Sequence, residues 1–176
     1  MTDALTHQER LNEDDVTSEW GWEGNVQKRI VEYLEREGWS VVHQADAALH
    51  DHGPDIDARK QGRPLLIEVK GLPSTRYRDP RRINERKRTN PRLQARHWFA
   101  QAFLKVVTLT DQAEGWETAI GLPAVDLYEG LVNSCERAFR ALGIGVYFVR
   151  TDGSVYLRVE HRSRADALDG RPETRS

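Results

Sequence analysis

Hydrophobic and polar positions alternate along the chain with two different periods, which predicts helices and strands in turn. Apolar residues at helical spacing (Val26, Ile30, Val31 and Leu34) predict a first helix, and Gly38 marks its end. Segments that alternate every second residue predict strands instead. The predicted helices are about 23–38, 91–109 and 126–143, and the predicted strands are about 39–42, 55–59, 64–70, 118–122, 146–150 and 155–159.

In chain order these elements read α-β-β-β-α-β-α-β-β, which predicts an α/β fold with a mixed central sheet flanked by helices. Gln61-Gly62 is predicted to be a tight turn between two of the strands. Asp152-Gly153, between apolar runs, predicts a second, C-terminal hairpin. Residues 1–18 and 163–176 have no hydrophobic period, so we expect two flexible tails, the first of them acidic, around one domain over 19–162.

Composition narrows the setting of this domain. The formal net charge is −2, so the whole chain is not a polycation, although its charges are segregated along the sequence. No apolar run approaches the roughly 20 residues that a membrane-spanning helix needs, so we expect no membrane association. The single cysteine, Cys135, cannot form an internal disulfide, which favours a reducing, cytoplasmic location.

Charged residues interrupt the strand pattern at Gly53-Pro54-Asp55 and at Glu68-Val69-Lys70. A hairpin at Gln61-Gly62 would bring the carboxylates of Asp55 and Glu68 together, and the strand period places Glu68 and Lys70 on one face. Two carboxylates suit Mg²⁺, or Mn²⁺, and a neighbouring lysine can orient a water for attack on a phosphodiester. The alternative is a solvated strand face on which Glu68 and Lys70 form a surface ion pair.

The pattern Pro54-Asp55, then Glu68-Val69-Lys70, resembles that of the PD-(D/E)xK nuclease superfamily, whose restriction endonuclease-like core has the order α-β-β-β-α-β. The resemblance covers residues 23–122. It implies that Asp55 and Glu68 bind Mg²⁺, that the backbone carbonyl of Val69 is a further ligand, and that Lys70 acts on the water. Glu23 matches by position a glutamate that many members carry on the first helix, with a helix N-terminal acid as the alternative. Asp57 lies on the same face as Asp55 and could be a ligand or an outer-shell group. The favoured interpretation is that Asp55 is the ligand and that Asp57 adjusts the local potential or faces solvent.

A basic segment follows the predicted site directly. Nine of the 21 residues in 76–96 are basic, against Asp79 and Glu85, and eight of the nine are arginines. Arginine suits bidentate contacts to phosphate and guanine, so this segment is predicted to bind nucleic acid rather than to form a bland charged surface. Gln94 is included because it resembles a polar residue that some superfamily members place beside the site. The predicted contact residues are Arg76, Arg78, Arg81, Arg82, Arg86, Lys87, Arg88, Arg92, Gln94 and Arg96.

The sequence therefore predicts metal-dependent hydrolysis of nucleic acid, with a DNA endonuclease as the favoured activity. Two alternatives stay open: a non-catalytic module that keeps the nuclease fold to bind nucleic acid or a partner, and a subunit of a larger complex. Cleavage of both DNA strands usually needs two sites, so a homodimer is a further expectation.

Overall fold

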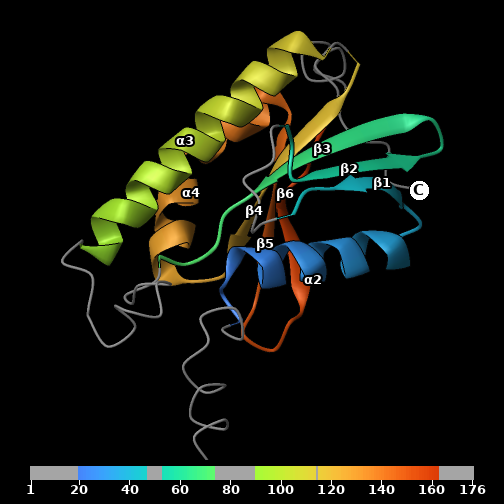
Figure 1. Ribbon diagram of the computed structural model, residues 1–176. Helices are drawn as coiled ribbons and strands as arrows, with labels where there is room; N and C mark the ends of the chain where they lie inside the picture. Colours follow the sequence, from blue (N-terminus) through green and yellow to red (C-terminus); the bar gives the residue numbers. More distant parts are fainter. Residues whose placement is uncertain (1–19, 47–52, 74–89, 114, 163–176) are drawn as a thin grey trace, which may run out of the picture.

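The computed structural model describes residues 20–46, 53–73, 90–113 and 115–162. Within these residues three helices flank a six-stranded mixed sheet, in the predicted order along the chain (Figure 1). The helices are α2 (Glu23–Arg36), α3 (Pro91–Gln112) and α4 (Asp126–Leu142). The strands are β1 (Ser40–Gln44), β2 (Ile56–Lys60), β3 (Arg63–Val69), β4 (Glu117–Pro123), β5 (Ile144–Val149) and β6 (Val155–Val159). The α/β fold class is therefore confirmed.

The sheet changes its pairing direction at β3. The strand order is β1-β2-β3-β4-β5-β6. The pairs β1–β2 and β2–β3 are antiparallel, β3–β4 and β4–β5 are parallel, and β5–β6 is antiparallel. Two tight turns allow antiparallel pairing, while α3 and α4 supply the long crossovers that parallel pairs need. Gln61 and Gly62 have φ values of 51° and 81°, the positive values of the hairpin turn that was predicted between β2 and β3.

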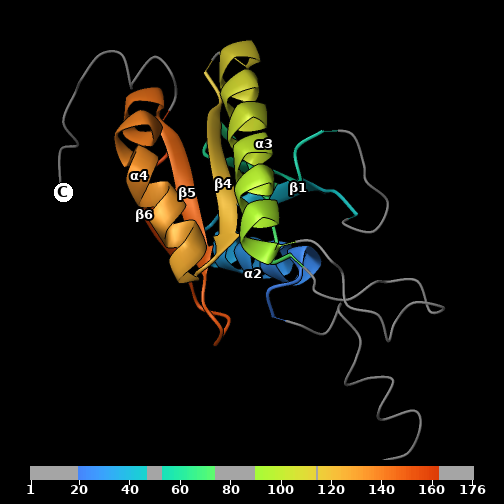
Figure 2. The ribbon, with the colours of Figure 1, turned by 90° about the vertical axis from the view of Figure 1, so that its left-hand side faces the viewer.

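The helices form two layers, with α2 on one face of the sheet and α3 and α4 on the other (Figures 1 and 2). In β3, alternate residues therefore enter different environments. Leu65, Ile67 and Val69 are fully buried with the apolar side of α2, while Glu68 lies on the opposite face, toward α3. This agrees with the predicted alternation and places the charged side chain between a strand and a long helix.

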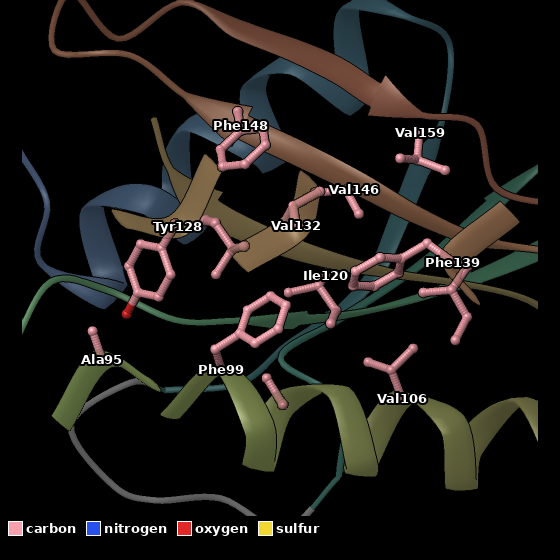
Figure 3. Close-up of a cluster of buried hydrophobic side chains, with 13 residues drawn as sticks. Ala95, Phe99, Val106, Ile120, Tyr128, Val132, Phe139, Val146, Phe148 and Val159 are labelled. Carbon is pink, nitrogen blue, oxygen red and sulfur yellow. The ribbon is translucent and has the colours of Figure 1, made fainter. Parts of the chain in front are cut away.

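The larger hydrophobic core lies between α3, α4 and the sheet, and Figure 3 shows its side chains converging from both layers. Asn90 begins α3 by accepting a hydrogen bond from the backbone N–H of Arg92, at 3.0 Å, and Pro91 occupies the first helical position. Each fully buried large apolar side chain contributes about 1.5–3 kcal/mol. The buried members of this core are Ala95, Phe99, Ala102, Val106, Ile120, Leu122, Tyr128, Val132, Phe139, Ile144, Val146, Phe148 and Val159.

A second buried feature is an ion-pair network at the start of β4. The carboxylate of Glu117, only 3% exposed, lies 2.7 Å from Nε of Arg63 and 2.6 Å from Nδ1 of His161. The other ring nitrogen of His161 lies 2.7 Å from the hydroxyl of Tyr147. Trp39 packs edge-on against the His161 ring. The network joins strands β3, β4 and β5 to the chain that follows β6.

The predicted tails, 1–18 and 163–176, lie outside the described residues, as does most of the basic segment. None of the described helices is long and apolar enough to cross a membrane.

Candidate active site

The predicted site residues converge where β2 begins and β3 ends. Because the two strands are antiparallel, with Ile56 opposite Ile67, Asp55 at the start of β2 lies beside the end of β3. Its Oδ2 accepts a hydrogen bond from the backbone N–H of Val69, at 2.6 Å. The structure therefore brings together two of the predicted metal ligands through a bond that also fixes the Asp55 side chain.

Glu68 is a buried carboxylate held between two lysines. Its residue exposure is only 3%, and its Oε1 lies 2.9 Å from the Nζ of Lys70. Its Oε2 lies 2.5 Å from the Nζ of Lys105 on α3, yet among the described residues no donor meets this oxygen in hydrogen-bonding geometry. The alternative of a solvated strand face is therefore wrong for Glu68, whose carboxylate is removed from water, although the ion pair with Lys70 that it expected is present.

Lys70 joins Glu68 to the first helix. Its Nζ lies 3.7 Å from Oε2 of Glu23, the first residue of α2, so the structure places Glu23 at the edge of the site. Burial lowers the pKa of the Lys70 ammonium, but the charges of Glu68 and Glu23 outweigh burial and hold the pKa above its ordinary value. Lys70 is thus a persistent cation that can stabilise negative charge and orient a water.

The surroundings of Asp55 shift the pKa of its carboxyl group. Burial is the largest cause and the negative charge of Glu68 the second, and together they raise the pKa of Asp55 to about 6. The hydrogen bond from Val69 and the charges of Lys70 and Lys105 oppose this rise only in part. Two carboxylates that share a buried site disfavour each other's charge, and a bound cation relieves that cost.

Gln27 supports the site and was missed by the sequence analysis. Its side chain is 3% exposed, and its Nε2 donates to the backbone oxygens of Ala45, at 2.9 Å, and Asp55, at 2.8 Å. One amide group on α2 thereby holds the two chain segments that flank the site. The available signal was its position: Gln27 lies one turn before Ile30 and Val31, on the buried side of the helix.

Gly71 lets the chain pass close to α2 as it leaves β3. A Cβ at this position would lie 2.5 Å from the backbone nitrogen of Glu23, a distance that no real side chain shows. The Gly71 carbonyl accepts a hydrogen bond of 2.8 Å from the buried Tyr128 hydroxyl, and the next residue, Leu72, donates to Gly21 at 2.7 Å. These contacts fix the position of Lys70 relative to Glu23.

The remaining predicted residues have other surroundings. Asp57 forms an ion pair with Arg59, which agrees with an outer position rather than a ligand. Arg92 and Arg96 lie on the first turns of α3 and line a hollow of about 460 Å³. Gln94 has a buried Oε1 without a hydrogen-bond partner among the described residues. The α3 residue that contacts Glu68 is instead Lys105, which is eleven positions further on, about 16 Å along the helix axis.

Seven of the predicted basic residues lie outside the described residues. They are Arg76, Arg78, Arg81, Arg82, Arg86, Lys87 and Arg88.

The donor set of the site can be compared with the needs of Mg²⁺. Within residues 20–46, 53–73, 90–113 and 115–162, no group of three or more His, Cys, Asp or Glu side chains is arranged to hold a metal ion. Mg²⁺, however, keeps several waters and is commonly bound through one or two carboxylates. Asp55 offers its second oxygen, and Glu68 offers Oε2, a buried oxygen that no described residue meets with a hydrogen bond. These two hard oxygen donors fit the ion.

No protein-family model matches the chain, and no curated protein matches it. The resemblance to the PD-(D/E)xK superfamily therefore stays a prediction that rests on the site residues and on the order of the elements.

Proposed function

We propose that this protein is a metal-dependent nuclease that hydrolyses phosphodiester bonds, with DNA as its substrate. The observation that carries the proposal is the buried carboxylate of Glu68 and the partly buried carboxylate of Asp55, beside the ammonium of Lys70 at adjoining strand ends. A solvent-shielded charge cluster of this kind costs stability unless it is compensated, and perturbed carboxylates of this kind are concentrated at functional sites.

The chain's own residues would divide the work as follows. Asp55 and Glu68 would hold Mg²⁺, with the Val69 carbonyl as the further ligand that the resemblance implies. When bound, the ion lowers the pKa of a water and stabilises charge on the phosphate. Lys70, kept protonated by Glu68 and Glu23, would orient that water and offset the negative charge that develops on the phosphate oxygens.

Substrate binding would use the arginines near the start of α3. Arg92 and Arg96 border the same hollow as the exposed Leu93, and the predicted basic segment leads into this helix. Arginine binds phosphate in bidentate geometry, and several such contacts give an affinity that falls steeply with salt. This supports a nucleic acid substrate.

The direct test is cleavage of closed circular plasmid DNA in Mg²⁺, in Mn²⁺ and in EDTA. Nicking or linearisation that requires the metal is expected, and a circular substrate reports endonuclease activity because it has no ends. Asp55→Asn and Lys70→Ala should abolish it. Glu32→Gln and Lys60→Gln, which alter exposed or distant groups of the same types, are the matched controls. Cleavage that persists in both site variants would refute the assignment.

A second function is favoured by a specific observation. Two ammonium groups already lie on Glu68, so this carboxylate is neutralised without a metal ion. The same fold could then serve as a non-catalytic module that binds nucleic acid or a protein partner. Salt-dependent binding of DNA that is equal in Mg²⁺ and EDTA, with no cleavage of DNA or RNA, would favour this module over the nuclease.

Two broader proposals concern the setting. The first is a cytoplasmic location, where the half-buried Cys135 would stay reduced. We also propose that a homodimer cuts both strands, since the described part of each chain holds one such site. Light scattering of the protein with and without a short duplex tests the dimer, and a mass of one chain under both conditions would contradict it.

A further inference from the structure

Lys105 is the feature of the site that neither the strand pattern nor the proposed chemistry assigns. It projects from the middle of α3, and its Nζ lies 2.5 Å from Oε2 of Glu68. This is the same oxygen that has no hydrogen bond among the described residues and that would be offered to a metal ion. The ammonium therefore occupies the position of a cation on the buried carboxylate.

The two lysines on Glu68 differ in their freedom to move. The Lys70 side chain is 17% exposed and lies between Glu68 and Glu23. The Lys105 side chain is 36% exposed and forms an ion pair with Glu68. A divalent ion bound to Oε2 at the usual distance, about 2.0–2.1 Å, would repel an ammonium beside the same oxygen. Lys105 is the group that can leave toward solvent.

We propose that Lys105 is a stand-in cation for the metal: it neutralises Glu68 in the metal-free protein, is displaced when a divalent ion binds, and then contacts a phosphate of the substrate. This inference rests on the proposed nuclease function. Lysine suits both positions, because its single charge sits on a flexible stem of four carbons. Metal binding and the phosphate contact are thereby coupled, because Lys105 can contact the phosphate only after the metal has displaced it from Glu68.

The first experiment measures Mn²⁺ binding to the full chain by electron paramagnetic resonance, with no nucleic acid present. Lys105→Gln, which removes the competing charge, is expected to bind Mn²⁺ about tenfold more tightly. Lys105→Arg keeps the charge and should not bind more tightly than wild type. Lys60→Gln removes the same net charge near Trp39, and its affinity should equal that of wild type. Should Lys105→Gln not fold, Lys105→Met is the substitute, because it keeps an unbranched side chain without charge.

The second experiment measures binding of a short DNA duplex by anisotropy over a range of salt concentrations, once in EDTA and once in Ca²⁺, with the duplex recovered to show that it is intact. In Ca²⁺, Lys105→Gln should bind more weakly than wild type, with a salt slope smaller by about 0.9, the value of one lost phosphate contact. In EDTA the two proteins should bind equally, because Lys105 is then held by Glu68. A purely structural role would weaken metal and DNA binding together, whereas the proposal requires changes of opposite sign.

The outcomes separate this inference from the nuclease proposal. If wild type binds Mn²⁺ and Lys105→Gln binds it no more tightly, or if the DNA affinities differ equally in EDTA and Ca²⁺, the inference is wrong while the nuclease proposal stands. If Lys105→Gln alone binds Mn²⁺, the displacement is refuted, because Lys105 then excludes the ion from the wild-type protein, and the nuclease proposal for wild type falls with it. If neither protein binds Mn²⁺, both proposals fall.

Discussion

Two buried glutamates on neighbouring strands have the same exposure and opposite surroundings. Glu68 near the end of β3 and Glu117 at the start of β4 are each 3% exposed. Both oxygens of Glu117 have partners, Arg63 on one and His161 on the other. Glu68 has two ammonium neighbours, but its Oε2 has no hydrogen-bond partner among the residues that the structure describes, and it lies beside a second carboxylate, Asp55.

The difference separates a buried charge that stabilises the fold from one that is available for chemistry. Burial raises the pKa of Glu117, but the hydrogen bonds and charges of His161 and Arg63 outweigh burial and leave the pKa below its ordinary value. Burial and the charge of Glu68 raise the pKa of Asp55, and the neighbouring groups do not cancel the rise. A completed network resists an incoming ion, whereas an incomplete one gains free energy from it.

The largest expected effect concerns activity and sharpens this comparison. Glu68→Gln should lower the rate of DNA cleavage by about a thousandfold or more, because metal binding and its stabilisation of phosphate charge contribute several kcal/mol. Glu117→Gln should leave the rate per folded molecule within about twofold, since the group lies outside the reacting centre. Single-turnover cleavage measured at a temperature where both variants are folded compares them. A loss of equal size in both would mean that Glu68 acts only through the fold.

The next effect is on the free energy of unfolding, and here the Glu117 variant is expected to lose more than the Glu68 variant. Glu117→Gln should lower the free energy of unfolding by about 2–4 kcal/mol, because it removes one partner of a buried ionic network and leaves His161 and Arg63 uncompensated. Urea unfolding gives the value. Glu68→Gln, measured in EDTA, should cost less than about 1 kcal/mol, because it also relieves the repulsion of Asp55. A greater loss in Glu68→Gln than in Glu117→Gln would contradict the distinction between the two sites.

The pH dependence of stability should also differ in sign. The folded pKa of Asp55, about 6, exceeds the ordinary value of 3.8, so its stabilising contribution is present below pH 3.8 and is lost as pH rises through 6. The contribution of Glu117 runs the other way, present above its ordinary pKa of 4.5 and lost as pH falls through the lowered folded value. In EDTA, wild type should lose about 2 kcal/mol relative to Asp55→Asn between pH 4 and pH 7.

Urea unfolding of wild type and Asp55→Asn at several pH values measures this effect, because subtraction removes the groups that the two proteins share. A difference curve that is flat from pH 4 to pH 7 would show that Asp55 titrates near its ordinary value. Saturating Mg²⁺ should reverse the slope, since the ion binds the deprotonated carboxylate.

The smallest expected effect concerns the support of the site from α2. Gln27→Leu removes the donor of two buried carbonyls, those of Ala45 and Asp55, and should cost about 1–2 kcal/mol of stability. It should also weaken Mn²⁺ binding, because the chain before β2 is no longer held. Gln101→Leu, on the exposed side of α3, is the matched control and should change neither quantity. Unchanged metal affinity in Gln27→Leu would limit its role to packing.

The convergence of Asp55, Glu68 and Lys70 could be predicted because it depends on local features. A two-residue turn fixes the register of β2 against β3, and the strand period then decides which side chains share a face. Lys105 could not be found in this way. The helical period places it beside the buried Val106, but its contact with Glu68 depends on how α3 packs against β3.

Other features of the molecule can also be separated into those that local spacing predicts and those that depend on tertiary packing. The helix over about 91–109 was predicted from spacing, whereas the double hydrogen bond of Gln27 depends on where two distant segments pass. The completed Glu117 network had no local signal either, because Arg63, Glu117 and Tyr147 meet through the parallel pairing of β3, β4 and β5. His161 joins them through the antiparallel pairing of β6 with β5.

The change of pairing direction at β3 has a consequence for the order in which the protein folds. The β2–β3 hairpin closes through a two-residue turn, and isolated hairpins form in about 1–10 microseconds. The pairing of Leu65 with Glu117 must wait for the chain to cross through α3, and such non-local contacts form more slowly. The acidic pair and Lys70 can therefore assemble early, while Lys105 joins them only when the second half of the sheet docks. Until then Glu68 is open to solvent cations, so divalent ions can speed or slow folding at this step.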